Sequence, residues 1–230
     1  MRIAGLLAVS VLVAACSQSV GGQAESSQPS SSPPPPPSTQ PSVSPSTQGP
    51  AAPSGAPAAT ASIDEVIAWI EAGTPADAES FHVTFRDGVT TRLGEETAFV
   101  AASGTPHSYT QCITGAGTLT CLLDLTSPPP RPAQAEGQWK PGWIEFSGTD
   151  LTVGALRGDP GPFLNGSGAE LPAGQSLTFG DTRCRSDVSG LYCVNYAHRG
   201  AVRIAADGVA PYGCLAETAA PPEAAARFSC

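Results

Sequence analysis

The chain has 230 residues, a formal net charge of −9 and only 13% charged residues, with 25 glycines and 24 prolines. A nucleic-acid-binding protein needs a basic surface that neutralises phosphates, so this acidic balance argues against that class. It also argues against polybasic binding to an anionic membrane surface. The sequence has no apolar run of about 18 residues, and it therefore predicts no bilayer-spanning helix in the mature protein.

The first residues have the pattern of a bacterial export signal. Arg2 supplies a positive charge, residues 3–13 are almost entirely apolar, and small residues precede Cys16, which predicts a signal peptide over residues 1–15. Residues 13–16, Val-Ala-Ala-Cys, resemble the lipobox of bacterial lipoproteins. That resemblance implies diacylation of Cys16 and anchoring to the extracytoplasmic face of the cell membrane. The alternative is a plain secreted protein that loses Cys16 with its signal.

Residues 16–61 connect this signal to the rest of the chain and have the composition of a linker. From residue 17 on, they contain eleven of the 24 prolines, including the unbroken run Pro33–Pro37, no aromatic residue and one charge, Glu25. Such a segment buries too little apolar surface to offset its ordering entropy. We expect a disordered tether that favours polyproline II structure and reaches about 140 Å when extended.

Residues 62–230 are predicted to form one folded domain that begins with a helix. Ser62 and Glu65 are three residues apart and match a capping box. Apolar residues recur at helical spacing between residues 63 and 70, and Gly73 predicts the end of the helix.

Short apolar runs separated by Gly, Asp and Pro clusters make up the sequence beyond this helix. The runs are residues 81–85, 143–146, 151–153, 177–179 and 201–204. Many short strands with turn residues between them are typical of β-sandwiches and barrels. The predicted fold is therefore mainly β, a disulfide-stapled antiparallel β-sandwich or barrel with one N-terminal helix.

Six cysteines follow Cys16, and they are the strongest structural signal in the domain. They are Cys112, Cys121, Cys184, Cys193, Cys214 and Cys230. An even number in an exported chain predicts three disulfides. The first two are nine residues apart, as are the third and fourth, and turn residues lie between them, so each pair is expected to face across a hairpin. The last two then pair by elimination. A metal site is the alternative, which the absence of a Cys-x-x-Cys pair disfavours.

The two hairpin pairs also resemble each other in sequence. Cys184 follows Cys112 by 72 residues, as Cys193 follows Cys121, and Thr110-Gln111-Cys112 resembles Thr182-Arg183-Cys184. This match indicates either a duplicated disulfide hairpin or a chance likeness between two short segments.

Three segments carry a family resemblance. Residues 109–121, the Pro-Pro-Pro-Arg-Pro segment at 128–132 and residues 180–196 resemble an extracytoplasmic module of actinobacterial proteins. With the lipobox and the tether, the layout is similar to that of mycobacterial lipoproteins of the LppI type over most of residues 62–215. The resemblance implies a location and an architecture, and no activity. Many relatives carry a cysteine where this chain has residues 133–135, Ala-Gln-Ala, so that bridge is expected to be missing.

The sequence offers few groups for catalysis or metal binding. Its histidines are His82, His107 and His198, and no Gly-x-Ser-x-Gly, His-Glu-x-x-His or Ser-x-x-Lys motif accompanies them. We expect His82 on a strand, the other two in loops, and none of them in a catalytic site. Asp159 and Glu170 lie in a Gly-rich loop whose spacing does not match a calcium loop. The sequence therefore predicts no catalytic residue, metal or cofactor.

The main functional prediction is a non-catalytic interaction module at the cell envelope. Its expected partners are the membrane, through the lipid anchor, and an envelope protein or glycan. Trp139 and Trp143 bracket a Lys-Pro-Gly turn and predict either an aromatic patch for such a partner or packing in the β core. One alternative is a carrier of lipid or small molecules, which needs a large apolar cavity. The other is an envelope hydrolase, which needs Ser, His and Asp to converge in a cleft.

Overall fold

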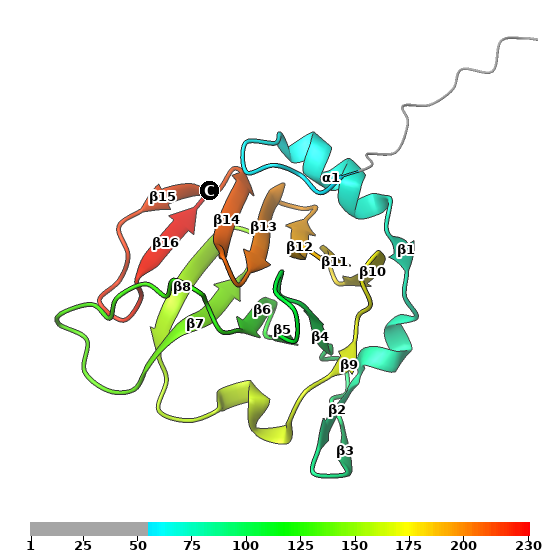
Figure 1. Ribbon diagram of the computed structural model, residues 1–230, viewed down its shortest axis with the longest axis horizontal. Helices are drawn as coiled ribbons and strands as arrows, with labels where there is room; N and C mark the ends of the chain where they lie inside the picture. The colour runs from blue at the N-terminus through cyan, green and yellow to red at the C-terminus, as the bar shows by residue number, and fades with distance from the viewer. Residues whose placement is uncertain (1–54) are drawn as a thin grey trace, which may run out of the picture. The chain divides into compact units, whose positions relative to one another are not determined.

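Figure 1 shows the computed structural model of the chain, which describes residues 55–230. The predicted signal peptide, Cys16 and most of the predicted tether lie outside the described residues. Residues 55–61, which composition assigns to the tether, have a defined conformation. The Ala61 amide donates a hydrogen bond to the Ala58 carbonyl oxygen at 2.9 Å, and Ala61 packs against the apolar cluster beneath the first helix. The folded part therefore begins earlier than the composition indicates.

Strands dominate the described residues. The helical segments are α1 (Ile63–Glu71) and two 3₁₀ helices, η1 (Ala78–Phe81) and η2 (Gly161–Asn165). The strands of the N-terminal part are β1 (Thr74–Pro75), β2 (Val83–Arg86), β3 (Val89–Arg92), β4 (Ala98–Ala102), β5 (Tyr109–Gly115), β6 (Thr118–Leu122), β7 (Trp139–Phe146) and β8 (Asp150–Leu156). Those of the C-terminal part are β9 (Ala169–Glu170), β10 (Gln175–Phe179), β11 (Thr182–Asp187), β12 (Gly190–Asn195), β13 (Gly200–Ala205), β14 (Gly208–Gly213), β15 (Ala216–Thr218) and β16 (Ala226–Ser229).

Two open sheets form a β-sandwich. One has the strand order β1-β10-β11-β12-β13-β14, the other β15-β16-β8-β7-β6-β5-β4-β9, and β2 and β3 form a separate hairpin that projects from the domain (Figure 1). Both sheets contribute to the main core, in which Phe99, Ile144, Leu151, Leu177 and Leu191 are fully buried. The predicted mainly β, disulfide-stapled fold with one leading helix is confirmed, as a sandwich of open sheets.

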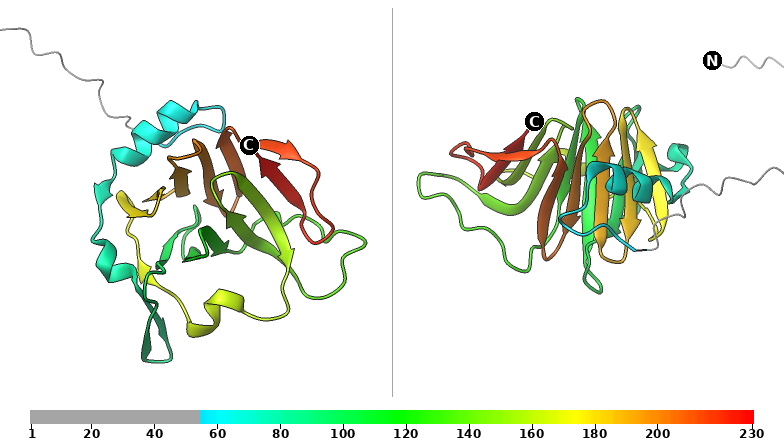
Figure 2. Two further views of the ribbon diagram at one scale, coloured as in Figure 1. Left: turned by 180° about the vertical axis from the view of Figure 1, so that it is seen from behind. Right: turned by 90° about the horizontal axis from the view of Figure 1, so that it is seen from above.

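The helix α1 begins at the predicted capping box and covers the outer face of the six-stranded sheet (Figure 2). The Glu65 amide donates to Ser62 Oγ, and the Ser62 amide donates to Glu65 Oε2 at 2.7 Å. These hydrogen bonds from Ser62 lower the pKa of the Glu65 carboxyl. Val66, Trp69 and Ile70 face the sheet and are buried. The apolar stripe of the helix thus places it against strands that follow more than a hundred residues later.

The sandwich consists of two halves with the same order of elements. The first half has α1 and β1 followed by the antiparallel meander β4–β8, and the second has η2 and β9 followed by the antiparallel meander β10–β14. The additional hairpin β2–β3 lies within the first half, and β15–β16 follow the second half and extend the sheet of the first by pairing β16 with β8. Repetition therefore extends beyond the two cysteine hairpins to whole sheets.

The two halves exchange their leading elements. β1 pairs in parallel with β10 of the second half, while β9 pairs in parallel with β4 of the first half. Likewise α1 packs on β11–β14, and η2 packs Phe163 against Trp143 of β7. Gly168, before β9, permits the close approach, since a Cβ there would lie 2.0 Å from the Ala98 carbonyl carbon. These two parallel pairs are the exception to the antiparallel pairing expected from sequence.

The three disulfides have the pairing that the spacing predicts. Cys112 lies opposite Cys121 across β5 and β6, with Cα atoms 4.1 Å apart, and Cys184 lies opposite Cys193 across β11 and β12, with Cα atoms 4.0 Å apart. All four are fully buried in the main core. The remaining disulfide, Cys214–Cys230, is exposed and joins the end of the second half to the C-terminus.

Candidate functional site

The three histidines lie in separate environments. His82 caps the C-terminal end of η1, and its Nδ1 lies 2.8 Å from the carbonyl oxygen of Glu96. The prediction of His82 on a strand is wrong, because Asp77 caps a 3₁₀ turn there and β2 begins only at Val83. His107 lies in the β4–β5 loop and His198 in the β12–β13 turn, as expected. Within residues 55–230, no three His, Cys, Asp or Glu side chains gather closely enough to hold a metal ion.

The tryptophan pair packs inside the domain. Trp143 is buried, its ring lies 5.5 Å from that of Phe163, and the Arg157 guanidinium lies 5.1 Å from the Trp143 ring centre. The Trp139 indole lies against Gly154, where a Cβ would come within 2.4 Å of the ring. Of the two interpretations, the structure supports packing in a buried cluster for Trp143, whereas Trp139 is half-buried.

An open hollow of about 620 Å³ lies on the outer face of the eight-stranded sheet. Strands β4, β5 and β6 direct Phe99, Cys112 and Cys121 into the core, so the alternating residues between them face outward. The lining residues are Val100, His107, Ser108, Tyr109, Gln111, Leu122, Leu123, Asp124, Ser167 and Glu170. We call this surface the Tyr109 hollow. Side chains from four strands and three loops meet in it, and its volume is that of small-ligand sites.

The Tyr109 hollow displays polar groups that the protein itself does not use. Tyr109 is 56% exposed, and Asp124 and Glu170 are exposed carboxylates. The ion pairs of the described residues use other carboxylates, those of Asp64, Asp87, Glu145, Asp150 and Asp207. No arginine or lysine lines the hollow. Its charge is therefore negative, and the carboxylates of Asp124 and Glu170 are free to contact a ligand.

The β4–β5 loop extends this surface towards the β11–β12 turn. A second hollow, of about 450 Å³, shares His107, Ser108 and Tyr109 with the first and adds Pro106 and Val188. Val188 is 76% exposed, and His107 holds a positive φ of 61°. A non-glycine residue in this left-handed conformation is uncommon and occurs often at ligand-binding sites. Tyr109 thus lies between two adjoining hollows and contributes to both.

The corresponding face of the second half is filled. Gln111 precedes Cys112 as Arg183 precedes Cys184, and both side chains donate to a carbonyl oxygen just before an exchanged strand. Gln111 Nε2 donates to Gly166 at 2.8 Å, and Arg183 Nη2 donates to Gly73 at 3.4 Å. The longer Arg183 also donates to Ser176 Oγ. The two halves therefore differ at this position: the first has a shorter, uncharged side chain, and the second has an arginine with additional hydrogen bonds.

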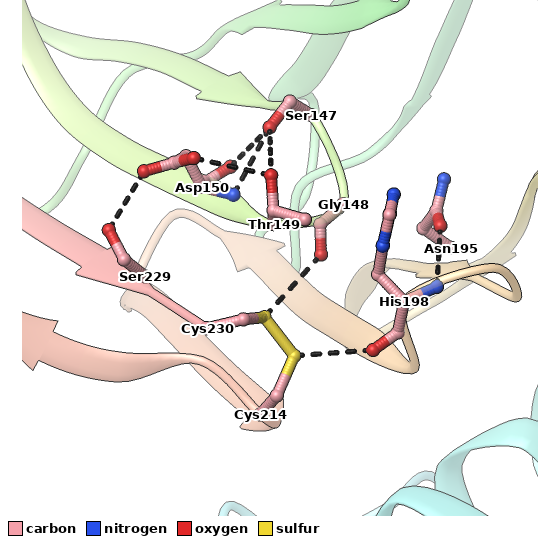
Figure 3. Close-up of a disulfide and its surroundings, with 9 residues drawn as sticks. All are labelled: Ser147, Gly148, Thr149, Asp150, Asn195, His198, Cys214, Ser229 and Cys230. Carbon is pink, nitrogen blue, oxygen red and sulfur yellow. Dashed lines mark hydrogen bonds between the residues drawn. A yellow bond between two sulfur atoms is a disulfide. The ribbon is translucent and has the colours of Figure 1, made fainter.

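A third hollow, of about 540 Å³, lies where turns of both halves meet. It is lined by the β5–β6 turn, Glu95, Glu96, Phe179, Asp181, Asn195 and His198, among others. The Cys214–Cys230 disulfide lies near this end of the domain (Figure 3). Cys214 Sγ lies 3.3 Å from the His198 carbonyl oxygen, and Cys230 Sγ lies 3.9 Å from that of Gly148. A disulfide sulfur has no hydrogen to donate, so these are packing contacts, and they fix the C-terminus against one turn of each half.

Asp150 attaches the last strand to the sheet, and its contribution to stability is expected to depend on pH. Hydrogen bonds from Arg227 and from Ser229 Oγ lower the pKa of the Asp150 carboxyl. Figure 3 shows the Ser229 hydroxyl group 2.8 Å from Asp150. Because the folded-state pKa is depressed, this stabilisation is complete above the unfolded pKa of about 3.9 and is lost as the pH falls through the folded value. Asp150→Asn should reduce the free energy of unfolding at pH 6 by about 1 kcal/mol or less, since the pair is partly exposed.

Urea unfolding of the wild type and of Asp150→Asn at pH 6 and pH 2.5 measures this effect. The difference between the two proteins should shrink on acidification. A difference that stays constant would show that the carboxylate does not hold β16 in place.

Comparisons of the chain with family models, with curated proteins and with solved structures find no match. Among residues 55–230, no helix is long and apolar enough to cross a bilayer. The resemblance to lipoproteins of the LppI type therefore stays a prediction.

Sequence reasoning missed the Tyr109 hollow. Tyr109 begins the segment 109–121 that carries the family resemblance, and the sequence indicates Glu170 only as a candidate oxygen ligand in a Gly-rich loop. No spacing pattern connects either residue with Asp124. The one local signal is the pair of tripeptides Thr110-Gln111-Cys112 and Thr182-Arg183-Cys184, in which glutamine replaces arginine. Its meaning depends on the carbonyl groups that these two side chains contact, which only the fold reveals.

Proposed function

We propose that this protein is a lipid-anchored, non-catalytic interaction module of the bacterial cell envelope, and that it binds an envelope component through the Tyr109 hollow. The lipobox-like residues 13–16 and the long proline-rich tether support the anchoring, and the three disulfides are consistent with an oxidising, extracytoplasmic compartment. The observation that carries the binding function is the open hollow with unpaired polar side chains.

The shape and lining of the hollow favour recognition over transport. Asp124, Glu170, Gln111 and the serines line an open depression, whereas a lipid carrier needs an enclosed apolar cavity to keep its cargo from water. The hollow contains a single histidine, His107, whose ring makes no hydrogen bond to another described residue. A hydrolytic site needs a nucleophile and a base in hydrogen-bond reach of each other, and His107 has no such partner among the described residues.

Binding to envelope material tests the proposed function. The full chain, purified in mild detergent, is mixed with washed, insoluble envelope material from an actinobacterium, and the bound fraction is measured by sedimentation. We expect saturable binding that Tyr109→Ala weakens by about tenfold, because an exposed aromatic contact contributes up to about 1.4 kcal/mol. The matched control is Tyr196→Ala, which removes a partly exposed tyrosine from the other half. Equal binding by wild type and Tyr109→Ala would contradict the proposal.

Anchoring has a separate test. The wild type should incorporate labelled palmitate and sediment with membranes, whereas Cys16→Ser should stay unlabelled. A wild-type chain that is unlabelled and freely secreted would refute the anchored location. The binding function of the Tyr109 hollow would still be tested separately by the sedimentation assay.

A further inference from the structure

We propose that the ligand of the Tyr109 hollow is a short, hydroxyl-rich saccharide that is uncharged or carries amino groups. The inference rests on the proposed function and specifies the ligand class of the same site. It follows from three properties of the lining: its charge, its hydrogen-bonding groups and its exposed aromatic ring.

The charge of the hollow excludes anionic ligands. Asp124 and Glu170 are both exposed and unpaired among the described residues, and no arginine or lysine lies in the lining to balance them. A phosphate, a sulfated sugar or an anionic lipid headgroup would meet two negative charges and no countercharge. A protonated amino group would gain from both carboxylates, and a neutral hydroxyl group would not be repelled.

The hydrogen-bonding groups of the hollow match hydroxyl groups. Each carboxylate accepts hydrogen bonds through two oxygens, and Gln111 keeps its Oε1 acceptor while its Nε2 donates to Gly166. Ser108 and Ser167 add hydroxyl groups that can donate as well as accept. A sugar ring carries hydroxyl groups that both donate and accept, on neighbouring carbons, and therefore suits a lining with many acceptors and a few donors.

The exposed Tyr109 ring supplies an apolar surface beside these polar groups. It is 56% exposed, and it lies between the two hollows that share it. The carbon-bound hydrogens of a sugar ring form an apolar face, which packs well on an aromatic ring while the hydroxyl groups point sideways to hydrogen-bonding partners. Pro106 and Val188, which line the second hollow, extend the apolar area beyond the Tyr109 ring. This larger area favours an oligosaccharide over a monosaccharide.

The second half supplies the design of a blocking variant. Gln111→Arg would place in the hollow the residue that fills the corresponding face of the other half, where Arg183 donates to the Gly73 carbonyl oxygen. The new guanidinium can make the same bond to Gly166 that Gln111 makes, so the fold is expected to persist. It would neutralise part of the negative charge and occupy the space above β5.

Titration calorimetry of the full chain with four soluble saccharides tests the proposal. The probes are cellotetraose and maltotetraose as neutral chains, a fully deacetylated chitosan tetramer as the amine-bearing chain, and a heparin tetrasaccharide as the anionic chain. We expect the chitosan tetramer to bind most tightly and the heparin tetrasaccharide not to bind. Raising the salt concentration should weaken binding of the chitosan tetramer and leave that of a neutral chain unchanged.

The variants separate the contributions of the lining. Tyr109→Ala and Gln111→Arg should each lower the affinity for every saccharide that binds the wild type by about tenfold or more. Asp124→Asn should lower the affinity for the chitosan tetramer by about tenfold and that for the neutral chains less. Tyr196→Ala, the control in the other half, should leave all affinities unchanged. Near-ultraviolet circular dichroism confirms that each variant keeps its fold.

The outcomes also distinguish this inference from the proposed function. Binding of the heparin tetrasaccharide as tight as that of the chitosan tetramer, or binding that Tyr109→Ala leaves intact, would overturn the saccharide proposal. If none of the four saccharides binds while Tyr109-dependent binding to envelope material persists, the ligand class is wrong and the interaction function stands. If envelope binding itself is absent, both are wrong.

Discussion

Replacing Cys112 and Cys121 together by alanine is expected to lower the free energy of unfolding by about 4 kcal/mol. Closing a loop of this size contributes about 3 kcal/mol by restricting the unfolded chain. Both sulfur atoms are also fully buried between the sheets, so the double variant leaves a void that adds about 1 kcal/mol. Urea unfolding without added oxidant or reductant, monitored by tryptophan fluorescence, measures the loss.

The surface disulfide provides the matched control. Cys214→Ala combined with Cys230→Ala opens a longer loop, with a sequence separation of 16 instead of 9, but these residues are exposed and leave no void in the core. We expect a loss of about 3 kcal/mol, smaller than that of the core pair. A larger loss from the surface pair would show that packing around the core sulfur atoms adds nothing. The single variant Cys112→Ser should lower the free energy of unfolding more than the core double variant does, because it buries a hydroxyl group beside an unpaired thiol.

Trp69→Ala is expected to cost about 4 kcal/mol of the free energy of unfolding. Trp69 is 1% exposed, its ring lies 4.7 Å from that of Tyr192, and the Arg185 guanidinium lies 3.9 Å from the centre of its ring. The truncation removes the main contact between α1 of the first half and the sheet of the second. Hydrogen exchange should therefore show faster exchange in β11–β13 as well as in α1.

An exposed residue of the same helix serves as the control for Trp69→Ala. Glu71→Ala should change the free energy of unfolding by less than about 0.5 kcal/mol, since the side chain is exposed and makes no ion pair with another described residue. If Trp69→Ala speeds exchange in α1 alone, the helix does not stabilise the sheet of the second half, and the predicted coupling between the halves is wrong.

The parts of the fold that sequence predicts well are those with local causes. Ser62 and Glu65 specify where α1 begins, because the two residues satisfy each other's backbone amides within one turn. The nine-residue spacing of Cys184 and Cys193 predicts a hairpin that places the pair face to face, with a loop of two or four residues. The structure has the shorter loop, since Asp187 pairs with Gly190. In both cases the interacting groups are close in sequence.

The exchange of β1 and β9 has no such local signal. Each strand is two residues long, and its partner is more than 60 residues away, so neither alternation nor turn chemistry reveals the pairing. The Tyr109 hollow was unpredictable for the same reason. Its carboxylates, Asp124 and Glu170, meet only after η2 crosses to the sheet of the first half. The sequence left two interpretations of Trp139 and Trp143, an aromatic surface or packing in the β core, and in the structure Trp143 is buried and Trp139 is half-buried.

The exchanged elements determine the order in which the protein can be completed during its synthesis. A chain that is synthesised N-terminus first presents α1 and β1 long before β10–β14, the strands they pack against, have emerged. Until η2 and β9 arrive, β4 is an unpaired sheet edge, and such edges are sites of aggregation. Neither half can reach its final state alone, because each needs strands supplied by the other, and the sheet of the first half is completed only when β16 pairs with β8.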